Sequence, residues 1–203
     1  MFMPKRKPLE CGVFQDIETA EKYDKEAAGW MRMASKSFVS TARKWGVTDG
    51  QVLDVGTGTG SLAVGFARGM PGVKVVGLDL SDVALQLARH NAQESEVSSR
   101  VSFKEGDAED MPFENNRFDL VVSSNTLHLV GNPVRMLDEV RRVLEPKGMF
   151  FISDLRRSWL GFFAEHIAAS YTPQEVEDML SQSKLQNWEL KDYLFWLSIY
   201  PKE

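Results

Sequence analysis

We predict a doubly wound α/β fold, with a mostly parallel, Rossmann-like sheet of seven strands and an antiparallel hairpin at its C-terminal end. Short apolar runs alternate with helical segments from Gln51 onward, and a glycine-rich run follows the first of them. The last two apolar runs, residues 188–191 and 194–200, have no helix between them. Strands that alternate with helices are typical of parallel sheets, and consecutive strands form hairpins.

The part before Gln51 has a helical pattern over residues 16–45. Apolar side chains recur there at steps of three and four residues, at Ile17, Ala20, Tyr23, Ala27 and Met31. We expect Gly29 to divide this stretch into two helices, since glycine is a poor helix former. Gly46 and the polar residues 48–50 end it.

The remaining elements follow the alternating pattern. We expect five further strands, at residues 52–55, 74–78, 101–103, 118–123 and 149–152. Helices are expected at 61–68, 81–94, 133–144 and 172–180, with Ser81 as an N-cap and residues 146–148 as a helix stop. The run at 118–123 is apolar on both faces, which is typical of a central parallel strand. A ligand would lie at the carboxyl ends of the strands, where the strand order reverses.

Length and charge indicate one acidic domain. The chain has 203 residues and a net charge of −5, from 24 basic and 29 acidic residues. We divide this single domain into a helical cap (1–48), a cofactor-binding core (49–155) and a substrate-side segment with the hairpin (156–203). An acidic balance argues against a nucleic-acid partner. The one basic cluster, Lys5 to Lys7, is interpreted as a solvated tail, with a targeting or lipid-binding patch as the alternative.

Few residues are available for metals or disulfides. The chain has one cysteine, Cys11, and three histidines, so we expect no disulfide framework and no metal site. No apolar run is long enough to span a membrane, and we find no signal-peptide pattern near the N-terminus. We therefore expect a cytoplasmic protein.

A glycine-rich loop is the main candidate binding feature. Gly56, Thr57, Gly58, Thr59 and Gly60 follow a predicted strand and open a predicted helix, as a nucleotide-binding loop does. A tight turn without a ligand is the alternative. Ser61 stands where a dinucleotide fingerprint has glycine or alanine, and the third glycine comes one residue early. This spacing disfavours a nicotinamide oxidoreductase.

Three acids end the first three strands of this part. Asp54 precedes the loop, where its charge would repel a pyrophosphate and attract a cation. Asp79 ends the second strand, where an acid can accept both hydroxyls of a ribose. Asp107 follows the third and could accept from an adenine amine. Each acid also has an alternative role. Asp54 could hydrogen-bond to the amides of the loop or cap the start of a helix, Asp79 could cap a helix, and Asp107 could lie in a surface loop.

Five motifs in this order resemble the class I S-adenosylmethionine-dependent methyltransferases. They lie at residues 52–60 (VLDVGTGTG), 76–81 (VGLDLS), 106–113 (GDAEDMPF), 118–123 (FDLVVS) and 143–148 (VLEPKG), about half of the chain. The pattern is most similar to the branch with ubiquinone/menaquinone C-methyltransferases and small-molecule methyltransferases. Residues 147–148 are Lys-Gly where some relatives have Gly-Gly, and the link after the fifth strand is short for this branch.

The resemblance implies cofactor contacts at matching positions. The loop would hold the methionine carboxylate and the sugar edge, Asp54 the ammonium and Asp79 the ribose. The remaining implied contacts are Asp107 with Ala108 and Leu80 at the adenine, Ser123 or Ser124 under the methionine, and Tyr23 as a closing side chain. An ordinary helix aromatic is the alternative for Tyr23.

Candidates for acceptor chemistry follow the fourth and fifth strands. His128 is the candidate general base, since its ordinary pKa of about 6.5 suits a proton acceptor; a structural histidine is the alternative. Candidate acceptor contacts are Trp30, Arg156, Trp159, Phe163 and His166. Aromatics beside Arg156 and Arg157 could form an apolar pocket with a handle for an anion, or belong to a packed helix with solvated arginines. His90 is expected to be solvated.

The sequence thus predicts direct methyl transfer from S-adenosylmethionine to a small molecule, leaving S-adenosylhomocysteine. A sulfonium methyl is already activated, so positioning and water exclusion are the main requirements. A non-catalytic module with the same fold, binding the cofactor or a partner, is the alternative. We expect a small-molecule acceptor, no nucleic acid and no membrane span, and leave a homodimer open.

Overall fold

The seven-stranded doubly wound fold is confirmed by the computed structural model, which describes residues 4–9 and 14–202. Cys11 lies outside these residues. The strands are β1 (Asp49–Val55), β2 (Gly72–Asp79), β3 (Val101–Glu105), β4 (Phe118–Ser124), β5 (Leu144–Leu155), β6 (Trp188–Asp192) and β7 (Trp196–Pro201). The helices are α1 (Ile17–Lys44), α2 (Ser61–Gly69), α3 (Asp82–Glu94), α4 (Pro133–Val143), η1 (Trp159–Phe162), α5 (Glu165–Ala169) and α6 (Pro173–Gln182).

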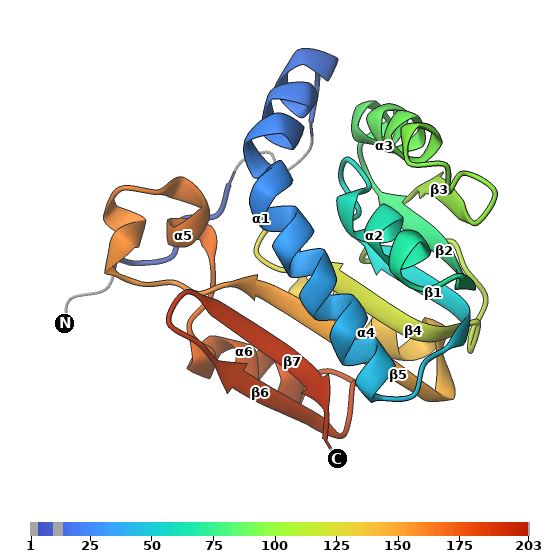
Figure 1. Cartoon of the computed structure of the whole chain (residues 1–203). Helices are drawn as coiled ribbons and strands as arrows, with labels where there is room; N and C mark the ends of the chain where they lie inside the picture. The colour runs from blue at the N-terminus through green and yellow to red at the C-terminus, as the bar shows by residue number, and fades with distance from the viewer. Residues whose placement is uncertain (1–3, 10–13, 203) are drawn as a thin grey trace.

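The strand order is β3-β2-β1-β4-β5-β7-β6 (Figure 1). The first five strands pair in parallel, and β7 pairs antiparallel with both β5 and β6. The chain moves outward from β1 to β3 and then crosses to β4 on the other side of β1. The order therefore reverses between β1 and β4, which is where ligands bind in open α/β sheets.

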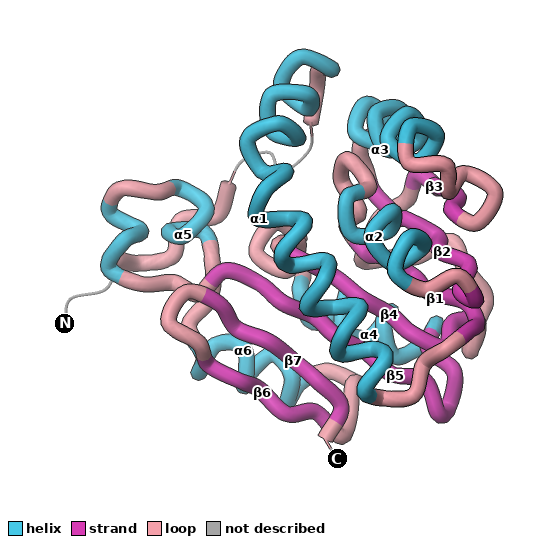
Figure 2. Tube along the Cα trace, in the orientation of Figure 1, coloured by secondary structure: helices cyan, strands magenta, loops and turns pink. Residues whose placement is uncertain are grey.

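Helices cover both faces of the sheet (Figures 1 and 2). On one face, Phe38 of α1 and Phe66 of α2 pack in a core with Val52 and Leu120 from the strands. The other core joins side chains of α4 and α6 to Leu53, Val121 and their neighbours. Successive strand residues point to opposite faces, so Val52 and Leu53 enter different cores. Both faces are buried, as the apolar strand pattern predicts.

Two local predictions need correction. Gly29 does not divide the N-terminal stretch, because α1 runs unbroken over Ile17–Lys44. One exposed glycine costs a helix only about 1 kcal/mol, which packing on both sides of it can offset. The fifth strand begins at Leu144 rather than Met149, and its register against β4 shifts between Phe118 and Leu120. Residues 145–148 lie in this irregular part of the strand, directly after the helix.

The basic N-terminal cluster is not a solvated tail throughout. Lys5 and Lys7 are exposed, but the backbone N–H of Lys7 donates to the Ala168 carbonyl at 3.1 Å. The Arg6 guanidinium lies 4.1 Å from the centre of the Tyr171 ring, and its Nε donates to the Ala169 carbonyl at 2.8 Å. The segment 4–9 is thus attached to α5.

Among the described residues, no helix combines the length and the apolar character that a membrane crossing requires.

Replacing Gly29 by alanine should stabilise the protein. The helix continues through this position, and a Cβ added there has no heavy atom within 4 Å. We expect Gly29→Ala to raise the free energy of unfolding by about 0.5–1 kcal/mol. Urea denaturation measures the change. Ala28→Gly, at the exposed neighbouring position, is the matched control and should lower stability by a similar amount. A loss of stability in Gly29→Ala would contradict an uninterrupted helix.

Candidate active site

The glycine loop joins β1 to α2 and needs glycine for two different reasons. Gly56, Gly58 and Gly60 have φ values of 69°, 53° and 83°, in the left-handed region. A Cβ on Gly56 would lie 2.1 Å from the Thr126 Oγ1, and one on Gly60 would lie 2.9 Å from the Ala88 Cβ. A Cβ on Gly58 would meet no heavy atom within 4 Å. Gly58 therefore borders open space, whereas the outer two glycines are packed against the protein.

The loop amides point to β2 rather than outward. The N–H groups of Gly56 and Thr57 both donate to the Leu78 carbonyl, at 2.8 and 2.9 Å. The Gly58 N–H donates to the Asp79 Oδ2 at 2.8 Å. A phosphate site needs such donors directed at the ligand. The loop geometry thus agrees with the sequence spacing in disfavouring a dinucleotide.

Two buried carboxyl groups flank the loop. Asp54 is 1% exposed and accepts a hydrogen bond from the Thr57 Oγ1 at 2.7 Å. Burial raises its pKa to about 7; the bond from Thr57 opposes the rise, and the nearby charge of Asp79 adds to it. Burial also raises the pKa of Asp79, although it accepts from the Ser81 and Gly58 amides. Buried acids without a cationic partner are costly. This pair therefore favours a ligand that brings positive charge and hydroxyl donors.

The N-terminal helix reaches over the loop. Asp24 of α1 accepts a hydrogen bond from the Thr59 hydroxyl at 2.5 Å. Tyr23 is 39% exposed, and its ring centre lies 5.3 Å from that of Phe14. Burial of part of the Tyr23 side chain raises the pKa of its phenol, with the charge of Asp24 adding to the effect. The sequence pattern did not single out Asp24, since one acid among many on a polar helix face carries no signal.

The predicted adenine contacts lie at the ends of β2 and β3. Leu80 is 52% exposed, directly after Asp79. Asp107 is exposed and accepts from the Glu109 N–H at 2.8 Å, so its side chain stabilises its own turn. Ala108 is half-buried against the sheet core. Asp79 pairs in register with Glu105, which places Asp107 only two residues beyond that pair.

The segment after β4 contacts the glycine loop directly. Ser123 is fully buried and donates to the Val55 carbonyl at 2.9 Å, whereas Ser124 is half-buried. The Thr126 hydroxyl lies 3.4 Å from the Gly56 carbonyl oxygen. Between them, Asn125 has a φ of 57°, and its buried Oδ1 has no hydrogen-bond partner among the described residues. Sequence reasoning missed Asn125, although asparagine after a strand is a typical left-handed residue.

Two histidines and an aspartate form a hydrogen-bonded row. His128, which follows β4, is 2% exposed, and its Nδ1 lies 2.6 Å from the Oδ1 of Asp154 at the end of β5. The His128 Nε2 lies 3.1 Å from the Nδ1 of His166 on α5. The sequence singled out both histidines but missed Asp154. Its position at the end of the fifth strand was the available signal.

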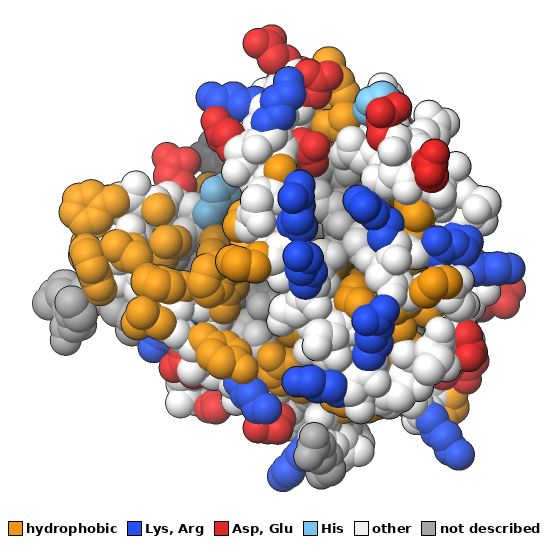
Figure 3. Space-filling view, in the orientation of Figure 1, with side chains coloured by type: hydrophobic (Ala, Val, Ile, Leu, Met, Phe, Trp, Pro, Cys, Tyr) orange, Lys and Arg blue, Asp and Glu red, His pale blue; other side chains and the backbone are white. Residues whose placement is uncertain are grey.

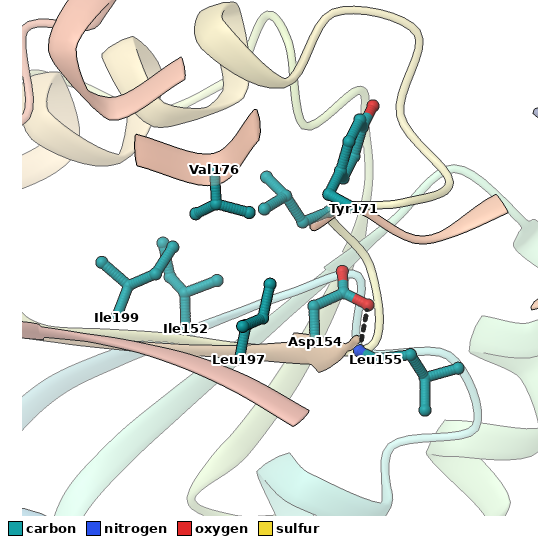
Figure 4. Close-up of a pocket in the computed structure, with 8 residues that line it drawn as sticks. Ile152, Asp154, Leu155, Tyr171, Val176, Leu197 and Ile199 are labelled. Atoms are coloured by element: carbon teal, nitrogen blue, oxygen red, sulfur yellow. Dashed lines mark hydrogen bonds between the residues drawn. The ribbon is translucent and has the colours of Figure 1, made fainter. Parts of the chain in front are cut away.

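Asp154 also borders a small apolar cavity. Figure 4 shows its carboxylate at the end of the sheet, directed toward Tyr171, with its hydrogen bond to the Leu155 N–H. The other lining residues are Leu127, Ile152, Leu155, Val176, Leu197 and Ile199. Apolar surroundings strengthen the interactions of a charge with its donors. A second, more open groove lies at the opposite end of the strands, where β1, β4 and β5 begin, around Trp45 and Pro146.

The two arginines of the predicted acceptor segment already have partners. Arg156 forms an ion pair with Asp192 at 2.5 Å. Arg157 is buried and pairs with Glu175 at 2.6 Å. The alternative of a solvated arginine pair is therefore wrong, and this geometry does not support an anionic handle either.

The aromatic candidates form two groups. Trp159 and Phe163 are 44% and 82% exposed, with ring centres 6.4 Å apart. Trp30 lies elsewhere, 5.5 Å from the ring of Trp196. Figure 3 shows hydrophobic side chains gathered over the α5 segment and the turn before β7. His90 is exposed on α3, as predicted.

A protein family described as a methyltransferase domain matches residues 47–193. This range begins just before β1 and ends just after β6, so it contains the glycine loop, the strand-end acids and the histidine row. The chain belongs to the class I S-adenosylmethionine-dependent methyltransferase family.

Curated methyltransferases resemble this family member over different lengths. Glycine/sarcosine/dimethylglycine N-methyltransferase from Actinopolyspora halophila is 29% identical over 204 residues, covering 95% of this chain and 34% of that protein. Demethylmenaquinone methyltransferase from Porphyromonas gingivalis is 30% identical over 155 residues, covering 66% of this chain and 63% of that protein. The chain thus spans less than two thirds of the length of either relative.

Solved methyltransferase structures share the fold. A SAM-dependent methyltransferase from Aquifex aeolicus superimposes with a TM-score of 0.74 at 18% identity, covering 92% of this chain and 98% of that one. An arsenic(III) S-adenosylmethionine methyltransferase from Chlamydomonas reinhardtii gives a TM-score of 0.65 at 20% identity, covering 77% and 64%. At these identities the likeness concerns the fold alone.

Alanine at Gly58 and at Gly56 should have unequal effects on folding. The left-handed backbone alone costs a non-glycine residue about 1–2 kcal/mol, which is the loss expected for Gly58→Ala. Gly56→Ala should cost more, since its Cβ would also lie 2.1 Å from the Thr126 hydroxyl oxygen. Urea denaturation of both variants measures the difference. Equal losses would contradict the assignment of open space to Gly58 alone.

Proposed function

We propose that this family member binds S-adenosylmethionine and transfers its methyl group to a small-molecule acceptor by direct in-line displacement. The observation that carries the proposal is the pair of buried acids, Asp54 and Asp79, on either side of a glycine loop whose amides point inward. A ligand with an ammonium, a ribose and no phosphate suits both features. Family membership supports the same cofactor.

The methionine end of the cofactor would lie against the loop, where Gly58 leaves room for close approach. Asp54 would face the ammonium, directly or through water. The buried Asn125 Oδ1 has no hydrogen-bond partner in the part of the chain that the structure describes, and it can accept from the same ammonium. Ser123 and Ser124 would lie under the methionine, although Ser123 already donates its proton to the Val55 carbonyl.

The nucleoside end would lie along the ends of β2 and β3. Asp79 would accept from the ribose hydroxyls in addition to its bonds from the Gly58 and Ser81 amides, since a carboxylate can accept several bonds. The exposed Leu80 would flank the adenine, and Asp107 with Ala108 would meet its polar edge. Tyr23 would close over the cofactor from α1, the helix that Asp24 attaches to the loop.

Bound S-adenosylmethionine supplies a methyl group on a positively charged sulfur, which needs no further activation. The residues of this chain therefore have to hold the acceptor in line and exclude water. Trp159 and Phe163, exposed on the segment after β5, are the proposed acceptor contacts. Small molecules are favoured because the names of the curated relatives specify glycine derivatives and demethylmenaquinone.

A non-catalytic module is the second candidate function. The exposed aromatic face of Trp159, Phe162 and Phe163 favours it, since such a patch also suits a protein partner. Incubation with methyl-labelled S-adenosylmethionine and a cell extract distinguishes the two. Labelled small-molecule products support the enzyme, and bound cofactor without any transfer supports the module.

Calorimetry with S-adenosylmethionine and S-adenosylhomocysteine tests the cofactor. We expect both to bind, and Asp79→Ala to weaken binding by about 1–3 kcal/mol, because ribose hydroxyls would lose their acceptor. Asp82→Ala, which removes an exposed acid three residues further on, is the matched control and should bind normally. Absence of binding at submillimolar concentrations would contradict the proposal, and unchanged affinity in Asp79→Ala would contradict the ribose contact.

Binding should tighten as the pH rises toward about 7, and below that pH it should release protons. The folded pKa of Asp54 is about 7 against an ordinary 3.8, so between these two values the free protein holds a proton that an unfolded chain has already lost. Folding stability from this group therefore falls as pH rises over that range. A bound ammonium favours the carboxylate and displaces the proton.

Calorimetry between about pH 5.5 and 7.5, in buffers of different ionisation enthalpy, measures both affinity and proton release. Asp54→Asn cannot ionise, so this variant should bind more weakly and with little pH dependence. A wild-type affinity that stays constant over the range would show that Asp54 does not face the ammonium.

A further inference from the structure

We propose that His166 is the proton acceptor of the reaction, oriented by His128 and Asp154, and that the methyl acceptor is an uncharged aromatic compound with a hydroxyl group. The proposal rests on the methyl transfer proposed above and adds the residue that removes the proton. His128 then acts as a positioning residue rather than as the base itself.

Asp154 determines which atom donates in each hydrogen bond of the row. Its Oδ2 accepts from the His128 backbone N–H at 2.9 Å, and its Oδ1 accepts from the Leu155 backbone N–H at 2.6 Å. Both side-chain oxygens of Asp154 therefore act as hydrogen-bond acceptors. The third close atom, the His128 Nδ1 at 2.6 Å, must then carry the proton of that hydrogen bond. In neutral His128 the Nε2 is consequently a lone-pair acceptor.

This tautomer fixes the tautomer of His166 as well. The His128 Nε2 lies 3.1 Å from the His166 Nδ1, so the Nδ1 of neutral His166 is the donor. Its Nε2 is left with a lone pair. Among the residues that the structure describes, nothing donates to this Nε2. Within the described residues, the row therefore ends in a basic nitrogen without a donor.

His166, and not His128, is the histidine that an acceptor can reach. His128 is 2% exposed with both ring nitrogens in hydrogen bonds, whereas His166 is exposed on α5. The row begins two residues after Thr126, which contacts the Gly56 carbonyl. It thus starts two residues from this loop contact and ends on α5, which packs against η1, the helical turn that begins at Trp159.

The charged groups around His166 keep it ready to accept a proton. Partial burial and the neighbouring His128 lower its pKa, against opposing effects of Glu165 and Asp154. The Arg6 guanidinium, which bonds to the His128 carbonyl and the Ala169 carbonyl, adds positive charge on the same side. His166 is therefore neutral near pH 7, as a general base must be.

The row takes up the proton that the acceptor loses when it is methylated. The acceptor hydroxyl gives its proton to the His166 Nε2, and an oxygen lone pair forms the new bond to the methyl carbon. The electron pair of the broken carbon–sulfur bond stays on sulfur. The Nδ1 proton of His166 can pass to the His128 Nε2, which places the resulting imidazolium beside the Asp154 carboxylate. A buried carboxylate stabilises an imidazolium in this way in other enzymes.

The surroundings select the acceptor class. A nucleophile that is already ionised or has no proton needs no base, whereas a hydroxyl does. Arg156 and Arg157 are paired with Asp192 and Glu175, so neither is available to an anionic acceptor. The exposed rings of Trp159 and Phe163 suit an aromatic ring.

Nitrogen-15 spectra of the histidine rings of the full chain test the row without any acceptor. We expect neutral His166 to carry its proton on Nδ1, and Asp154→Asn and His128→Gln to move that proton to Nε2. His90, exposed on α3 and outside the row, is the internal control and should keep the same signals in every variant. A wild-type His166 with its proton on Nε2 would overturn the proposal.

Two naphthalene probes test the base and the acceptor class: 2-naphthol, which keeps its hydroxyl proton at neutral pH, and 2-naphthalenethiol, which ionises far more readily. We expect the wild type to methylate 2-naphthol and His166→Gln to lower that kcat/KM by about 100-fold or more. The thiol rate should change only a few-fold, and binding of S-adenosylhomocysteine should be unchanged. A wild-type rate for 2-naphthol in His166→Gln, or equal losses on both probes, would overturn the role of His166.

The outcomes separate the two proposals. A wild type that binds the cofactor but does not methylate 2-naphthol contradicts the acceptor class. A wild type that binds no S-adenosylmethionine contradicts the proposed function, and the ring-nitrogen spectra still decide whether the row has the inferred direction.

Discussion

The candidate site depends on one constraint, the parallel pairing of β1 with β2 on one side and β4 on the other. These two pairings bring the glycine loop, Asp79 and the segment after β4 to the same edge of the sheet. The contacts that join them are short: the loop amides bond to the Leu78 carbonyl, and Thr126 fills the space that a Cβ on Gly56 would need. A change in the order of these strands would separate all of the proposed ligand contacts.

Much of this architecture could be predicted because it has a local cause. Strand and helix periodicity, the position of the glycines and an acid at each strand end are all visible in neighbouring residues. Ser81 is an N-cap in the structure, as its place before the apolar face of α3 predicts. The prediction for Gly29 was wrong because helix propensity alone does not include the packing of α1 against α2 and the sheet.

The remaining features arise from contacts between distant parts of the chain. Arg6 bonds to Ala169 across 163 positions, and His128 meets Asp154 and His166 across 26 and 38. No periodicity indicates such contacts. The sequence singled out His128 and His166 separately, one as a base and one as an acceptor contact. Only the fold makes them neighbours and shows which of the two is exposed.

The position of β7 affects how this protein can fold during synthesis. It is the last of the seven strands in the chain, yet it lies inside the sheet, between β5 and β6. Until β7 is made, β5 has an unpaired edge and β6 has no neighbour, and both are open to pairing with other chains. The strands of the cofactor half, β1 to β4, pair with one another and make no pairing with β7. The Asp154 end of β5 pairs with β7 at Leu197, so the proposed acceptor side can be completed only after β7 is made.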